Sequence, residues 1–146
     1  MKKQGFTLIE LLAVIVILAV IALIATPLIT NTINNARKNA DRESARSYVS
    51  TVEEKITEAM LEYPNLVVGN RTNAVTADAD LRSWPCTNCG TGNTTLPIDF
   101  KGTAPQKAQL TWTDGKITGK LKYTNGCWSI SADGSMTELT SDAFCN

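Results

Sequence analysis

An apolar run dominates the first part of the chain. The segment Phe6–Ile24 is interrupted only by Thr7 and Glu10, and the next charged residue after Glu10 is Arg37. At about 1.5 Å of rise per residue, a helix of this length spans the roughly 30 Å of a bilayer core. The run therefore predicts a transmembrane helix. Lys2 and Lys3 precede it, an asymmetry that predicts a cytoplasmic N-terminus and a C-terminal part on the other side of the membrane.

Beyond this run the apolar positions take the spacing of an amphipathic helix. They recur three and four residues apart at Ala45, Val49, Val52, Ile56, Ala59 or Met60, and Tyr63, and the predicted solvated face holds Glu53, Glu54, Lys55, Glu58 and Glu62. Pro64 ends the pattern, because the residue before a proline avoids helical geometry. The two patterns predict one helix from Thr7 to Glu62. Pro27 removes the hydrogen bond to the carbonyl of Leu23, which predicts a kink or local melting there.

From Ala108 onward the period of the pattern changes to two. Three turn pairs, Asp114-Gly115, Asn125-Gly126 and Asp133-Gly134, separate four alternating segments, which predicts an antiparallel meander. The face predicted to cover the helix carries Leu110, Trp112, Ile117, Leu121, Tyr123, Trp128 and Ile130, and the outer face carries Lys116, Lys120 and Lys122.

The segment between these elements is rich in Asn, Thr, Gly and Pro and has no sustained period. It predicts a connecting loop with short elements, such as those at 65–68 and 77–82. The predicted fold is α+β, with a transmembrane helix at 6–30, an amphipathic helix at 31–63, the connecting region at 64–107 and the sheet at 108–146.

Charge and composition narrow the function. The chain holds 14 basic and 14 acidic side chains and no histidine. A near-neutral chain without a basic run has no electrostatic footprint for nucleic acid. The lack of histidine excludes histidine acid–base catalysis and histidine metal ligation. No cofactor and no enzymatic activity are predicted.

Four cysteines lie outside the apolar run, at Cys86, Cys89, Cys127 and Cys145. An even number on the non-cytoplasmic side predicts two disulfides, with three connectivities open. A thioredoxin-type site at Cys86 and Cys89 is the first alternative, but no βαβ pattern flanks it. Structural zinc is the second, but Cys127 and Cys145 are too far apart in sequence to form a second close pair.

Glu10 is the unusual residue of the apolar run. A carboxylate in such a segment costs about 2.5–3.5 kcal/mol on insertion scales, so it requires a partner. The nearest cation would be an α-amine at Phe6 of a neighbouring subunit, if the chain were cut before Phe6. The alternative is a carboxylate solvated at the headgroup boundary.

The short basic leader, the Gly5-Phe6 junction and the glutamate that follows resemble the class III signal of type IV prepilins and pseudopilins. The resemblance implies that a membrane peptidase removes residues 1–5 by cutting between Gly5 and Phe6. The same enzyme would methylate the new N-terminus at Phe6. Glu10 would then act in assembly, and Pro27 would be the helix-kinking proline common in such pilins.

The same resemblance implies a long N-terminal helix packed on a C-terminal antiparallel sheet, and a disulfide between Cys127 and Cys145 that leaves Cys86 to pair with Cys89. It implies a structural subunit that passes from membrane lipid to an extracellular type IV pilus, a homopolymer built on an assembly platform, with adhesion among the roles of such filaments. The alternatives are a pseudopilin of a type II secretion or DNA-uptake machine, and a membrane-anchored thiol–disulfide oxidoreductase. Asp133 and Asp142 are similar to the calcium-site aspartates of major pseudopilins, although Asp133 also begins an Asp-Gly turn. Such pseudopilins generally lack cysteines, which favours the pilus subunit.

Overall fold

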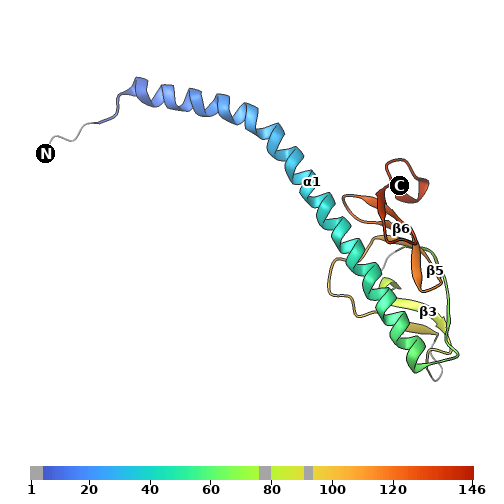
Figure 1. Cartoon of the computed structure of the whole chain (residues 1–146). Coiled ribbons are helices and arrows are strands. Elements are labelled where there is room, and N and C mark those ends of the chain that lie inside the picture. Colours follow the sequence, from blue (N-terminus) through green and yellow to red (C-terminus); the bar gives the residue numbers. More distant parts are fainter. Residues whose placement is uncertain (1–4, 76–79, 91–93) are drawn as a thin grey trace. The chain divides into compact units, whose positions relative to one another are not determined.

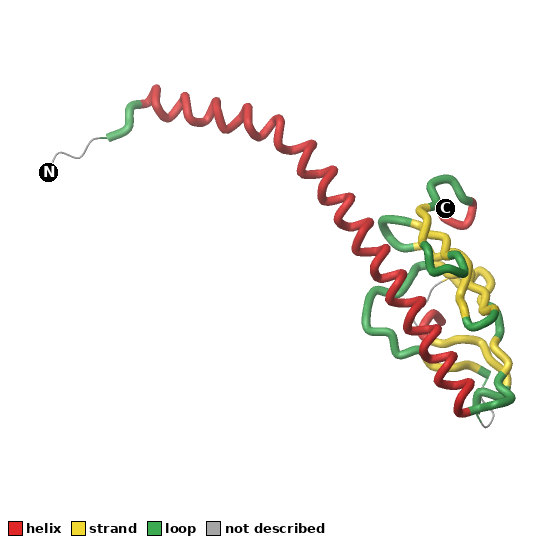
Figure 2. The backbone as a smooth tube through the Cα atoms, in the orientation of Figure 1, coloured by secondary structure: helices red, strands yellow, loops and turns green. Residues whose placement is uncertain are grey.

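The apolar run and the amphipathic stripe form a single helix. In the computed structural model, which describes residues 5–75, 80–90 and 94–146, α1 extends from Leu8 to Glu62 (Figure 1). Two antiparallel sheets follow it (Figure 2), which confirms the predicted α+β class. The chain divides into two compact units, residues 1–37 and residues 38–146. The second unit is called the head below.

The helix of the first unit is apolar on all sides and continues through Pro27 without a break. The backbone therefore does not melt at the proline, and a kink there remains a prediction. Thr26 donates its hydroxyl hydrogen to the carbonyl of Ala22 at 2.7 Å, and Thr30 and Thr32 make the same i−4 bond. These bonds satisfy hydroxyl groups that an apolar environment would otherwise leave unpaired.

The predicted meander is present in the head. The larger sheet has the order β2-β5-β6-β7-β8, and its strands are β2 (Arg71–Val75), β5 (Lys107–Thr113), β6 (Lys116–Lys122), β7 (Cys127–Ile130) and β8 (Met136–Glu138). All neighbours are antiparallel, and the register between β5 and β6 places Trp112 opposite Ile117. The turn pairs of the sequence fall between the strands as expected.

The region predicted as a connecting loop is more regular than expected. Besides β2 it holds β1 (Val67–Val68), β3 (Ser83–Thr87) and β4 (Thr95–Pro97), which form a second sheet in the order β1-β3-β4, and the 3₁₀ helix η1 (Asp80–Arg82). The start of the element predicted at 77–82 lies outside the described residues. Strands of two to five residues are too short to display an alternating period, which is why the sequence pattern misses them.

The buried stripe of α1 and the inner face of the sheet share one core. Tyr48, Val52 and Ile56 from the helix are fully buried, as are Leu110 and Leu121 from the sheet. Trp84 of β3 joins this core and donates its indole N–H to the carbonyl of Gly69 at 2.9 Å. Of the predicted inner-face residues, Trp112 is only partly buried.

Glu53 corrects the prediction of a uniformly solvated acidic face. Its carboxylate accepts a hydrogen bond from the backbone N–H of Ile117 at 2.9 Å and lies 3.8 Å from the ammonium of Lys116. The pairing of β6 with β7 covers only Gly119 to Lys122 on β6, so Ile117 lies beyond that ladder. Glu53 therefore links the helix to the sheet by satisfying this backbone donor.

Because Tyr48 and Tyr123 are buried, we expect the head to lose stability at alkaline pH. Burial raises the pKa of Tyr48 to about 12 and also raises the pKa of Tyr123. A phenol that stays neutral in the fold contributes stability below its unfolded pKa of 10.0, and this stability is lost as the pH rises toward the folded value. We expect the free energy of unfolding to fall above pH 10 by about 1.4 kcal/mol per pH unit for each tyrosine.

Denaturant unfolding of the detergent-solubilised chain between pH 8 and pH 12 measures this loss. Tyr48→Phe is the matched variant, because it keeps the ring and removes the ionisable group. Its stability should fall less steeply with pH, and an identical slope would contradict the assignment.

Candidate functional site

The N-terminus of α1 is closed by a reciprocal pair of side chains. Thr7 donates both its backbone N–H and its hydroxyl to the Glu10 Oε2 atom, at 2.7 and 2.8 Å. The backbone N–H of Glu10 is directed in return at the Thr7 hydroxyl oxygen, at 3.4 Å. This is the capping-box arrangement, which satisfies amide donors that have no partner within the helix.

The capping box gives Glu10 a role at the start of its own helix, which was not predicted from the sequence. The sequence pattern that predicts it was available, because Thr7-x-x-Glu10 has the spacing of a capping box. Both bonds use Oε2, and among the described residues Oε1 accepts no hydrogen bond. Removal of residues 1–5 would leave the Thr7 amide in place. Glu10 is therefore able to cap its own helix and still offer an oxygen to another cation.

Gly5 and Phe6 precede this cap. A Cβ atom placed on Gly5 would meet nothing within 4 Å, and Phe6 is 90% exposed. Among the described residues no neighbouring atom thus requires a glycine at position 5, which favours a requirement imposed by a binding partner. The remainder of the leader predicted at 1–5 lies outside the described residues.

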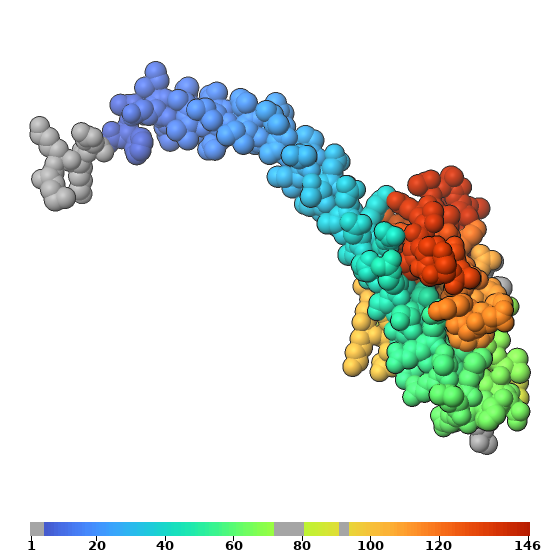
Figure 3. All heavy atoms as spheres, viewed as in Figure 1, coloured from blue at the N-terminus to red at the C-terminus, as the bar shows by residue number. Residues whose placement is uncertain are grey.

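The surface of the N-terminal helix is the largest uncovered apolar area of the described chain. Among the described residues α1 is the one helix that is long and apolar enough to cross a membrane, and its most apolar 18-residue window has a mean hydropathy of 3.2. Within the described ranges no part of that window is buried. On the face drawn in Figure 3, this stretch of α1 is at the surface. Such a surface requires lipid or other protein around it.

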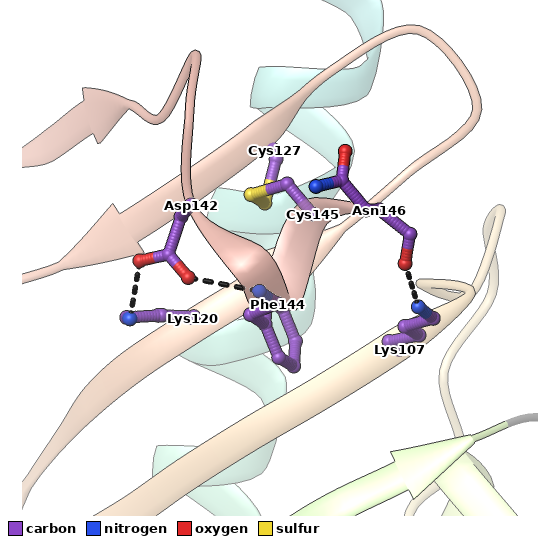
Figure 4. The surroundings of a disulfide bond; sticks show 7 residues. All are labelled: Lys107, Lys120, Cys127, Asp142, Phe144, Cys145 and Asn146. Carbon is purple, nitrogen blue, oxygen red and sulfur yellow. Dashed lines mark hydrogen bonds and ion pairs between the residues drawn. A yellow bond between two sulfur atoms is a disulfide. The ribbon is translucent and has the colours of Figure 1, made fainter.

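The C-terminal segment is fastened across the outer face of the larger sheet (Figure 4). Cys145 is paired with Cys127 of β7, and their Cα atoms are 5.9 Å apart. One carboxylate oxygen of Asp142 accepts a hydrogen bond from the ammonium of Lys120. The other oxygen accepts a hydrogen bond from the backbone N–H of Phe144, so that Asp142 caps the 3₁₀ helix η2 (Ala143–Cys145). The ammonium of Lys120 beside it lowers the pKa of Asp142. The predicted outer face is therefore partly covered by the chain itself.

The aspartates that resemble a calcium site have local partners instead. Asp133 accepts the backbone N–H of Ser135 at 2.9 Å, as the first residue of an Asp-Gly turn does, and this bond lowers its pKa. Asp142 is held by Lys120. Within the described parts of the chain, no three acidic, cysteine or histidine side chains gather as a metal site would require.

The second cysteine pair, Cys86 and Cys89, lies at the end of β3 and in the turn after it. Both residues are buried, at 7% and 5% exposure. Reactive thiols in Cys-x-x-Cys sites are exposed and stabilised at the start of a helix. Cys86 lies in a strand, and the pair serves to close the turn that contains Asn88, whose φ is 60°. The geometry is that of a structural bridge.

The pairings lead to an expected thiol content. We expect the unreduced protein to contain no titratable thiol and no zinc. Closing the loop between Cys127 and Cys145 should contribute about 3 kcal/mol to the stability of the head by the chain-entropy estimate. Thiol titration under denaturing conditions, metal analysis and disulfide mapping by mass spectrometry measure these quantities.

Cys127→Ser with Cys145→Ser and Cys86→Ser with Cys89→Ser form a matched pair of variants. The first should lose more stability because its loop is longer. Two or more free thiols with bound zinc in the unmodified protein would contradict the disulfide assignment.

Comparison with known proteins finds a match in the N-terminal region that contains Gly5, Phe6 and Glu10. Residues 1–26 match the family model of the prokaryotic N-terminal methylation motif. This motif is the class III signal of type IV pilins and pseudopilins. The searches of curated proteins and of solved structures gave no match.

Proposed function

We propose that the chain is the precursor of a structural subunit of a type IV pilus. The observation that carries the proposal is the methylation motif at residues 1–26, which overlaps a helix whose apolar window is not buried among the described residues. The peptidase would cut between Gly5 and Phe6 and methylate Phe6. The head would lie outside the cytoplasmic membrane until assembly moves the subunit into an extracellular filament.

Assembly in this proposal exchanges one apolar environment for another. The helix leaves lipid and joins a bundle of identical helices. Because both surroundings are apolar, the transfer contributes little to the free energy of assembly, which is then determined by packing between subunits. Oε1 of Glu10, which accepts no hydrogen bond from the described residues, would accept one from the Phe6 amine of a neighbour. Oε2 would keep its hydrogen bonds from Thr7. The two cysteine pairs, both in the head, favour a pilus subunit over a pseudopilin of a secretion or DNA-uptake machine.

The N-terminus of the mature protein tests the proposal. We expect mass spectrometry of the membrane-extracted subunit to find a chain that begins at N-methylated Phe6. Gly5→Leu should leave residues 1–5 attached in essentially all copies, while Gly5→Ala keeps a small residue and permits cutting. Because a Cβ at position 5 has open space, lost processing in Gly5→Leu reports on the peptidase rather than on misfolding.

Electron microscopy of the sheared cell-surface fraction supplies the second measurement. Filaments that contain the processed subunit as their main component are expected. A chain that begins at Met1, or one cut behind the apolar run, would refute the signal assignment. Correct processing without any filament would leave a pseudopilin as the better description.

A further inference from the structure

Three cations follow one another at four-residue intervals where α1 enters the head. These are Lys38, Arg42 and Arg46, defined here as the basic ladder. Lys38 and Arg46 are about half exposed and pair with Glu138 and Glu43, at 2.5 and 3.3 Å. Exposed pairs of this kind contribute little to stability. Lys38 and Arg46 are thus able to exchange these partners for others of the same charge. Arg42 between them is held by its own head, because its Nη2 atom donates to the carbonyl of Met136 at 3.4 Å and its Nε atom is buried.

Three carboxylates have the same spacing at the other end of the helix. Glu54, Glu58 and Glu62, defined here as the acidic ladder, are all exposed. Among the described residues only Glu58 has an ion pair, with Lys55 at 2.6 Å. Leu61 lies beside this ladder and is 83% exposed. The acidic ladder is therefore a charged surface with an exposed apolar side chain at its edge, and Lys55 is the cation paired with it among the described residues.

The acidic ladder is unfavourable for an isolated head. Like charges four residues apart on a helix repel one another. The last turn also carries the negative end of the helix dipole, where cations are favoured, yet α1 has no basic residue in its last turn. The repulsion between like charges and the helix dipole therefore both make the acidic ladder unfavourable in an isolated head. A cationic partner that covers the ladder would reverse both of them.

The two ladders lie on different sides of the helix. At about 100° per residue, their centres are roughly 160° apart around the axis, and 16 residues separate them, or roughly 24 Å of rise. In Figure 3, α1 lies at the surface of the head in this view. Two surfaces of opposite charge on different sides of one molecule can form a heterologous contact. With this offset along the axis each contact adds a translation, so the assembly is an open helical polymer rather than a closed ring.

We propose that the acidic ladder of one copy binds the basic ladder of a second copy further along the filament, with the head helices parallel and staggered by roughly 24 Å. This second copy is not the neighbour whose Phe6 amine would pair with Glu10, because that contact offsets the two helices by only about 6 Å. Lys38 then faces Glu54, and Arg46 faces Glu62. This contact rests on the proposed polymerisation and specifies how heads join outside the apolar bundle. Leu61, beside the acidic ladder, would be covered at the edge of this contact.

Charge reversal in the full-length chain tests the contact. The acidic variant carries Glu54→Lys and Glu62→Lys, and the basic variant carries Lys38→Glu and Arg46→Glu. Each should lower the amount of sheared filament by on the order of tenfold or more, with processing and membrane level unchanged. The four substitutions together should restore assembly, because opposite charges again face each other. Lys101→Glu, an exposed change outside both ladders, is the control and should assemble normally.

Cross-linking supplies a measurement that does not depend on yield. Lys38→Cys with Glu54→Cys places two thiols on one helix at a separation of roughly 24 Å, too far for a short bismaleimide to join within one copy. Filaments of this variant should therefore give a ladder of covalent multimers on a denaturing gel. Ala40→Cys with Glu54→Cys places the first thiol near the same height on another side of the helix, and should give monomer.

The outcomes separate the contact from the proposed function. Normal filaments from either reversal variant, or equal cross-linking of the two cysteine variants, would overturn the contact and leave the pilus subunit intact. Absence of filaments from the unmodified chain would refute polymerisation itself. Failure of the four-substitution variant to assemble, while both reversals are processed and exported, would also count against the contact.

Discussion

Glu10→Gln is expected to yield a processed, membrane-resident subunit that forms almost no filaments. Glutamine occupies the same position in capping boxes as glutamate, so the helix start is kept and only the charge is removed. The Phe6 amine of a neighbour would then be left without a counter-ion in an apolar bundle. Leaving one member of a buried pair alone costs about 3–5 kcal/mol. Because 1.4 kcal/mol is a factor of ten, filament yield should fall by roughly two orders of magnitude or more.

Thr7→Ala is the matched control for this prediction. It removes the hydroxyl that bonds Glu10 Oε2, while the Thr7 amide bond to the same oxygen and the carboxylate charge remain. Loss of a threonine cap costs about 1 kcal/mol, and surrounding lipid or helices hold the rest of α1. We expect this variant to assemble at close to the normal level. Immunoblotting of sheared and membrane fractions, with the N-terminus checked by mass spectrometry, measures both variants.

The opposite pattern would identify Glu10 as a capping residue. In that case Thr7→Ala would impair assembly and Glu10→Gln would not. Normal filaments from both variants would mean that the carboxylate is solvated at the membrane boundary and that the pairing with Phe6 does not occur.

The sequence predicts those parts of the fold that depend on local pattern. The long helix follows from apolar spacing, and its observed end at Glu62 follows from Pro64. The meander follows from the Asp114-Gly115 and later turn pairs, since such turns need residues that accept positive φ. Asp114 has a φ of 50° and Gly115 a φ of 79°.

Features that depend on distant partners were not predictable in this way. β2 joins the sheet at the edge of β5 with an irregular register between Arg71 and Ala74, and no local signal encodes that pairing. Glu53 bonds an amide 64 residues away, so the helix pattern alone assigns it to solvent. The charges of the basic and acidic ladders and their two sides of the helix follow from the sequence and helical geometry. The partners of Lys38 and Arg46 and the exposure of the acidic ladder required the structure.

The candidate site shows the same distinction between features that are local in the sequence and features that depend on distant contacts. The Gly5-Phe6 junction and Glu10 come from sequence, because the peptidase reads residue types in a short segment. The structure adds that Gly5 has no internal constraint and that Glu10 is already bonded to Thr7. The residue pattern alone left three cysteine connectivities open, and the resemblance to pilins implied Cys127 with Cys145 and Cys86 with Cys89. The structure has these two pairs, and the return of the C-terminal segment over β7 brings Cys145 to Cys127.

Gly119→Ala is expected to destabilise the head by about 3 kcal/mol or more. Gly119 lies opposite Leu110 in the pairing of β5 with β6 and has a φ of 140°, which residues with a side chain rarely adopt. A Cβ at this position would lie 2.0 Å from the carbonyl oxygen of Gln109 and 2.9 Å from the Leu110 Cα atom. Both neighbours are backbone atoms of the central strand pair, so no side-chain rotation relieves the contact.

Gly115→Ala is the matched control, because it tests positive φ without the clash. Gly115 lies in the turn between the same two strands with a φ of 79°, and a Cβ there meets nothing within 4 Å. Its cost should be limited to about 1–2 kcal/mol for the left-handed conformation. Thermal unfolding of the purified full chain should show a loss of roughly 10 °C or more for Gly119→Ala and clearly less for Gly115→Ala. Equal losses would mean that β5 and β6 move apart readily and that their close approach at Gly119 is not required.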